Sequence, residues 1–170
     1  QMESSKVHHP PSPSCLGGLS FLAAAMCYRY TLNDLQAVRA MFESAGLSAD
    51  LVPSDFSPRH NVALTNVMPV IVAGLRPAGL TLRFGLTLPA RTTTQKSLLV
   101  GNARAETLLA KPAFHAATNH RRCLVPADGY YEWSGAEGRK VPFFVQRPDK
   151  GLFALAGLWE HWMGADGSEL

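Results

Sequence analysis

The chain lacks several features that would classify it at once. No apolar run approaches the roughly 18 residues that a membrane-spanning helix needs, so no membrane segment is expected. Neither a GxGxxG nor a GxxxxGK[ST] phosphate loop is present, and there is no internal repeat. The three cysteines, Cys15, Cys27 and Cys123, form no CxxC motif. We therefore expect no metal, no cofactor and no disulfide framework, and we favour a reducing compartment.

The charge balance excludes little by itself. The 170 residues fit about one domain, and their formal net charge is only +3. Arginines outnumber lysines eleven to five. The planar guanidinium suits bidentate contacts with phosphate, but an arginine-rich composition also follows from GC-rich coding. Composition leaves both explanations open.

Residues 1–26 differ from the rest of the chain. They combine a segment rich in proline and serine with a short apolar stretch, and the His8–His9 pair is interpreted as a solvated tail. A secretory or lipoprotein signal fits poorly, because the bulky Met26 precedes Cys27 where a small residue is expected. We expect residues 1–26 to be a leader that is disordered or removed, followed by one folded domain over residues 27–170.

From residue 27 onward the pattern predicts an α+β domain. Residues 31–47 have apolar positions at helical spacing, with Thr31 or Asn33 as the cap and Gly46 at the end. Short strand-like segments predominate after it, and they predict a curled, mostly antiparallel, barrel-like sheet with short peripheral helices. These segments are residues 68–74, 80–88, 121–133, 141–147 and 151–162, with two helical turns within 103–119. The chain ends directly after an apolar strand, so we expect the C-terminal part of the domain to be missing.

Cys27 directly follows a methionine. If Met26 initiates the chain and is removed, Cys27 presents an amine and a thiol on adjacent atoms, with reference pKa values of about 8 and about 8.5. Such an amine adds to an aldehyde to give an imine, and the thiolate can close on it to form a thiazolidine ring. The alternative is a small buried hydrophobic residue. The position of Cys27 alone leaves both interpretations open.

Two further segments contain residues suited to chemistry. In "GNARAET", residues 101–107, Asn102 could orient a terminal amine and Arg104 could hold a phosphate, although an asparagine before a helix is often only a cap. In "RRCLVPADGYYEW", residues 121–133, the Asp128–Gly129 turn leads into aromatic residues around Glu132. Partial desolvation would suit Glu132 to acid–base work, and aromatics beside arginines suit single-stranded nucleic acid. An aromatic core strand with an exposed glutamate is the alternative.

Taken together, five segments resemble the SRAP family, the SOS-response-associated peptidase-like proteins that process abasic sites. The resemblance extends over residues 26–162. The segments are "MC.RY" at 26–30, "PRHNVALT" at 58–65, "NARAET" at 102–107, "RRCLVPADGYYEW" at 121–133 and "FALAGLWEHW" at 153–162.

The resemblance implies a specific chemistry. Family members lose the initiator methionine and trap the ring-opened aldehyde of an abasic site in single-stranded DNA as a thiazolidine crosslink, which shields the lesion. Cys27 would be the nucleophile, Asn102 would position its amine, and Glu132 would act as acid and base. The DNA-binding positions implied are Arg29, Asn61, Phe84 and Arg104. The implied partner is single-stranded DNA with abasic sites, bound by a monomer without a membrane, in the cytoplasm or nucleoid of a bacterium or the nucleus of a eukaryote.

The sequence also departs from the family pattern. Tyr28 stands where glycine is usual, Leu64 where proline is usual, and Phe84 where tryptophan is favoured. The family's catalytic histidine belongs to a later "HDRMP"-like segment that has no match here, and His161 does not fit that motif. Two other functions stay open: a cysteine peptidase with an N-terminal nucleophile, for which self-removal of the residues before Cys27 would be one step, and an inactive, truncated family member.

Overall fold

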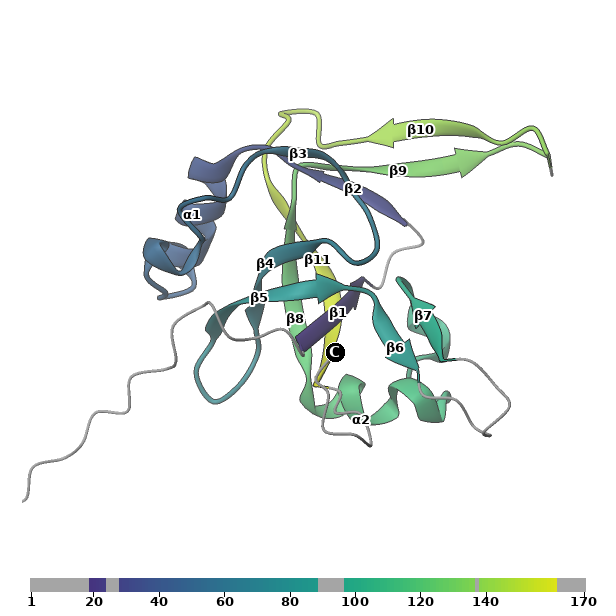
Figure 1. Ribbon diagram of the computed structural model, residues 1–170, viewed down its shortest axis with the longest axis horizontal. Helices are drawn as coiled ribbons and strands as arrows, with labels where there is room; N and C mark the ends of the chain where they lie inside the picture. Colours follow the sequence, from purple (N-terminus) through teal and green to yellow (C-terminus); the bar gives the residue numbers. More distant parts are fainter. Residues whose placement is uncertain (1–18, 24–27, 89–96, 137, 162–170) are drawn as a thin grey trace, which may run out of the picture.

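The computed structural model describes residues 19–23, 28–88, 97–136 and 138–161. Most elements are strands that follow one another in runs, and the short helices lie between these runs (Figure 1). The elements are β1 (Leu19–Ala23), β2 (Arg29–Leu32), α1 (Leu35–Ser44), the 3-10 turn η2 (Ala49–Leu51), β3 (Arg59–Val62), β4 (Val67–Val72), β5 (Ala78–Phe84), β6 (Leu86–Leu88), β7 (Leu98–Val100), the 3-10 turn η3 (Ala105–Thr107), α2 (Pro112–His120), β8 (Arg122–Ala127), β9 (Gly129–Ser134), β10 (Val141–Val145) and β11 (Phe153–His161).

The strands form a closed barrel and two smaller sheets. The barrel has the order β1-β11-β8-β4-β5, and parallel pairing of β1 with β5 closes it. The other barrel pairs are antiparallel. A four-stranded sheet, β10-β9-β2-β3, and a ribbon of β6 and β7 complete the fold. The predicted α+β class, with a curled and mostly antiparallel barrel-like core, is confirmed.

Part of the expected leader belongs to the barrel. Leu19–Ala23 form β1, which pairs with β11 along its whole length and with β5 at Ser20 and Phe21. An open barrel would leave unpaired backbone N–H and C=O groups on β11 and β5, and β1 provides partners for them. These five residues of the expected leader thus form a strand, whereas its removal stays a prediction. Residues 1–18 and 24–26 lie outside the described residues.

Helix α1 forms as its apolar spacing predicts, but with a different cap. Val38 and Phe42 are buried, and Gly46 follows the helix with a positive φ of 75°. Asp34, not Thr31 or Asn33, caps the N-terminus by accepting a hydrogen bond from the Ala37 amide at 2.9 Å. No helix in the described part of the chain is long and apolar enough to cross a membrane.

Two clusters of buried side chains hold the sheets and helices together. The larger one fills the barrel and the space between the four-stranded sheet and α1, and its fully buried members include Tyr30, Leu32, Val38, Phe42, Val62, Met68, Val70, Leu82 and Phe84. The smaller one packs α2 against β6 and β11 through Leu86, Phe114, Ala117 and Leu158. The smaller cluster matters for function because Phe114 also lines a cavity, described next.

Candidate functional site

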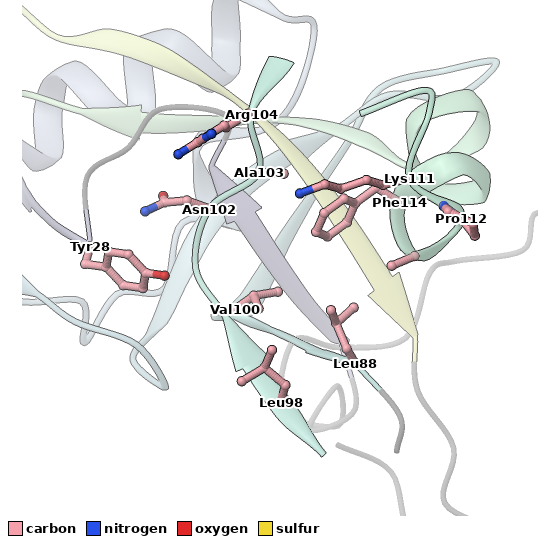
Figure 2. A pocket seen from close by; sticks show the side chains of 11 residues that line it. Tyr28, Leu88, Leu98, Val100, Asn102, Ala103, Arg104, Lys111, Pro112 and Phe114 are labelled. Carbon is pink, nitrogen blue, oxygen red and sulfur yellow. The ribbon is translucent and has the colours of Figure 1, made fainter. Parts of the chain in front are cut away.

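A cavity of about 740 Å³ opens between Tyr28, the β6–β7 ribbon and the start of α2. Its apolar wall is made by Leu88, Val100 and Phe114. Its polar lining comes from Asn102, Arg104 and Lys111. Tyr28, which directly precedes β2, therefore meets the distant stretch between β7 and α2 here (Figure 2).

The turn after β7 supplies the amide and one cation. Asn102 is half-buried and lies between β7 and η3, at the strand-to-helix junction that the sequence predicts. Arg104 is exposed and occupies the N-cap position of η3, where its side chain makes no capping hydrogen bond. In Figure 2 the side chains of Asn102 and Arg104 extend toward the same side of this turn as Tyr28.

Lys111 brings a second cation to the cavity. It takes the N-cap position of α2, where Pro112 begins the helix. Its side chain is exposed and reaches back from α2 toward the turn that carries Asn102 and Arg104 (Figure 2). Sequence reasoning missed Lys111. The signal that could have identified it is a lysine directly before a proline that starts a helix, only seven residues after Arg104.

Gly101 lets three side chains approach the turn closely. A Cβ atom added at Gly101 would lie 2.8 Å from Leu64 Cδ2, 3.4 Å from Tyr28 Cδ1 and 3.5 Å from Phe84 Cζ. The first of these distances is shorter than real Cβ contacts, so a side chain at this position would displace Leu64. The absence of a side chain at Gly101 therefore leaves room for Leu64, and Tyr28 lies at ordinary contact distance from the same position.

Arg29 and Asn61, both predicted to contact DNA, meet outside the cavity. Arg29 Nη1 donates a hydrogen bond to Asn61 Oδ1 at 3.0 Å, which joins β2 to β3 on an exposed surface. The amide oxygen carries no formal charge to offset that of the guanidinium, which has further N–H donors for another acceptor.

Glu132 lies on β9, next to the beginning of β2. The antiparallel register pairs Thr31 with Gly129 and Arg29 with Tyr131. Glu132 is the next residue on β9 toward the Tyr28 end of β2, and its side chain is half-buried. Glu132 does not line the cavity.

The expected DNA-stacking role of Phe84 needs correction. Its side chain is 0% exposed, and its ring packs edge-on against Tyr30 with centroids 5.6 Å apart. A nucleobase cannot stack on a ring whose faces are covered by protein. Phe84 is a core residue that supports the floor beneath Gly101.

Cys27 lies outside the described residues, and Tyr28 is its nearest described neighbour. Within residues 28–88, 97–136 and 138–161, together with β1, no three His, Cys, Asp or Glu side chains gather so that they could hold a metal ion.

Comparison with known proteins identifies relatives for most of the chain. A family model described as SOS response associated peptidase (SRAP) matches residues 26–170. The abasic site processing protein YobE of Bacillus subtilis is 33% identical over 147 residues, which cover 85% of this chain and 66% of that protein. The abasic site processing protein HMCES of Gallus gallus is 29% identical over 87 residues, which cover 40% of this chain and 26% of that protein.

A solved structure agrees with the fold. A protein from Bacteroides thetaiotaomicron superposes with a TM-score of 0.65 at 23% identity, covering 84% of this chain and 64% of that one. The chain thus spans just under two thirds of the length of the Bacillus relative and of this structure. Because the family model matches the whole of residues 26–170, and a relative of one third identity matches most of the same region, the chain belongs to the SRAP family.

Proposed function

We propose that this chain processes abasic sites in single-stranded DNA by forming a thiazolidine crosslink through Cys27. The observation that carries the proposal is the cavity beside Tyr28, the residue that follows Cys27, with Asn102, Arg104 and Lys111 in its lining. An amide and two cations are groups that suit the binding of an aldehyde flanked by phosphates, and they lie in the cavity that Tyr28 also lines. Two relatives named as abasic site processing proteins support the processing of abasic sites.

The proposed reaction needs no oxidant and no metal. The α-amine of Cys27 adds to the aldehyde carbon of the ring-opened abasic site, and loss of water gives an imine. The Cys27 sulfur then adds to the imine carbon, which forms the C–S bond, and the thiol proton ends on the ring nitrogen. One water molecule leaves for each crosslink. Only a cysteine at the N-terminus can close this five-membered ring, so the residues before Cys27 must be removed, and self-removal by the cysteine is one route.

Each remaining residue has a role in this proposal. The Asn102 side-chain oxygen accepts a hydrogen bond from the Cys27 amine and orients it toward the aldehyde. Arg104 and Lys111 bind phosphates that flank the lesion, and Arg29 binds another from the surface next to Asn61. Glu132 donates and accepts protons during the loss of water and the ring closure.

Intact-protein mass spectrometry tests the proposal. Protein beginning at Gln1 and protein beginning at Met26 are each incubated with a single-stranded oligonucleotide that carries one abasic site. We expect the Met26 protein to lose its methionine and to gain the mass of the oligonucleotide minus one water. A crosslink from the Gln1 protein would show that the residues before Cys27 are removed.

Two cysteine variants provide the matched controls. Cys27→Ala must abolish the crosslink, whereas Cys123→Ala, which alters a buried thiol in the barrel, must retain it. Cys27→Ser separates this reaction from a peptidase, because serine could still remove the preceding residues but cannot form a thiazolidine. If folded protein with a free Cys27 gains no mass, the proposed chemistry is absent from this chain.

A further inference from the structure

Three side chains meet around Gly101 in this structure. Tyr28, Leu64 and Phe84 come from different segments, and each approaches the position that a Cβ atom of Gly101 would occupy, at 2.8–3.5 Å. Leu64 and Phe84 fill the space beneath the turn, and Phe84 is fully buried. The three side chains therefore gather around one point of the turn, where the absence of a side chain at Gly101 leaves room for Leu64.

Tyr28 combines support with exposure. Tyr28 Cδ1 lies 3.4 Å from the position that a Cβ atom of Gly101 would occupy, yet the residue remains 49% exposed and lines the cavity. A ring that is partly covered and otherwise open to solvent loses little conformational freedom when a flat partner stacks on it. Such supported aromatic rings, placed beside cations, are the stacking platforms of proteins that bind single strands.

The cations of the cavity determine what such a partner is. Arg104 and Lys111 line the same cavity as Tyr28. A strand that binds phosphates at Arg104 and Lys111 brings the base of a neighbouring nucleotide to the ring. An abasic nucleotide has no base, so the base next to the lesion is the one available to stack.

We propose that Tyr28 is the stacking platform for the base adjacent to the abasic site and thereby sets a preference for purines at that position. This inference rests on the proposed function, because it assumes that the cavity binds a single strand with a lesion. Purines are favoured because their larger ring systems overlap more of the tyrosine ring.

A binding experiment with an unreactive lesion isolates this step. The full chain is titrated into a single-stranded oligonucleotide that contains tetrahydrofuran, which has no aldehyde and cannot crosslink. The fluorescent base 2-aminopurine is placed next to it, on the 5′ side in one oligonucleotide and on the 3′ side in another. We expect Tyr28 to quench 2-aminopurine in one of the two complexes at saturation. We also expect Tyr28→Leu to restore the emission and to weaken binding about tenfold.

Three variants make the outcome specific. Tyr28→Phe keeps the ring, and it should keep both the quenching and the affinity. Leu98→Ala alters another exposed residue of the cavity that has no aromatic ring, and it should leave the emission unchanged. Arg104→Ala should weaken binding whichever base flanks the lesion, without changing the emission at saturation.

The possible failures are distinguishable. If the wild-type chain does not bind the oligonucleotide at all, both the proposed function and this inference are wrong. If it binds but Tyr28→Leu has the same emission and affinity, the inference alone is overturned. Tighter binding by Tyr28→Gly would also overturn it, because Tyr28 would then obstruct the strand.

Discussion

At the scale of single residues, Asp128 connects parts of the chain that are distant in sequence. Its carboxylate accepts hydrogen bonds from the Thr31 hydroxyl, from the Asn33 amide and side chain, and from the Asp34 amide. The turn motif predicts a bend at Asp128–Gly129, but not these partners. The carboxylate thereby fixes the corner between β2 and α1, and β2 begins beside the cavity.

Substitution of Asp128 should therefore destabilise the fold. Asp128→Ala leaves partly buried donors of Thr31 and Asn33 without an acceptor, and we expect the free energy of unfolding to fall by about 2–3 kcal/mol. Asp128→Asn keeps one acceptor oxygen and should lose about half as much. Urea unfolding followed by tryptophan fluorescence measures both. Equal stability of the alanine variant and the wild type would contradict the assigned role.

Cys123 makes stability depend on pH in the alkaline range. Burial raises the pKa of its thiol from 9.0 to about 12. Below pH 9 the folded and unfolded states both hold this proton, whereas between about pH 9 and 12 only the folded state does. The contribution of this thiol to the free energy of unfolding is therefore fully present below its unfolded pKa of 9.0. It is lost as pH rises toward the folded pKa of about 12, with a slope of up to about 1.4 kcal/mol per pH unit.

The difference between wild type and Cys123→Ala isolates this contribution, because both contain the same lysines and tyrosines. We expect the alanine variant to be less stable at pH 7, since it removes a buried sulfur from the core. The gap should narrow as pH rises above 9. A gap that stays constant from pH 8 to 11 would argue against a buried, protonated thiol.

At the scale of elements, close packing between β5 and α1 depends on Gly79. A Cβ atom there would lie 2.6 Å from Phe42 Cε1 and 3.2 Å from Leu51 Cβ, and Phe42 is fully buried. Gly79→Ala should therefore lower the free energy of unfolding by about 1–3 kcal/mol through overpacking. Combining it with Phe42→Leu, which removes the tip of the ring, should cost less than the sum of the two single changes. Additive losses in urea unfolding would show that the two positions do not press on each other.

The hairpin of β9 and β10 is more exposed than a core strand, which its aromatic pattern also allows. The aromatic pattern of residues 130–133 allows a core strand, and Tyr130 does pack against the core. Trp133, Phe143 and Phe144 instead remain about half exposed, and the hairpin extends away from the barrel (Figure 1). Apolar composition favours a strand at this position, but it does not indicate which residues of that strand the rest of the protein covers.

At the scale of the whole molecule, β1 links barrel closure to the proposed chemistry. The reaction requires a free N-terminus at Cys27, but β1 lies upstream of that cysteine and pairs with both β11 and β5. Protein that begins at Met26 lacks this strand. We expect it to unfold at lower urea concentration than protein that begins at Gln1, because two barrel strands lose a hydrogen-bonded neighbour.

Cleavage after the barrel has closed has a different consequence. A cut between Met26 and Cys27 frees the amine, while the backbone pairing of β1 can persist without a covalent link. We expect native mass spectrometry of the processed protein to detect the upstream fragment bound to the remainder of the chain. Processed protein that has lost the fragment, yet is as stable as uncut protein, would show that β1 contributes little to the barrel.

The sequence by itself determined those features that depend on neighbouring residues. Apolar residues at a spacing of three to four predicted α1, with Val38 and Phe42 on its buried face, because a helix repeats every 3.6 residues. The succession of short strands predicted an α+β domain, and contiguous motifs such as "NARAET" predicted the family. These motifs also brought attention to Asn102 and Arg104, which the structure joins in one cavity.

Tertiary structure decided what depends on distant partners. Closure by β1, burial of Phe84 and the approach of Tyr28 to Gly101 each require segments that only the fold brings together. The bond from Thr31 to Asp128 spans 97 residues of chain, and no local periodicity records such a contact. The physical reason is that burial and hydrogen-bond partners belong to the environment of a residue in space, and one chain's local pattern specifies that environment only in part.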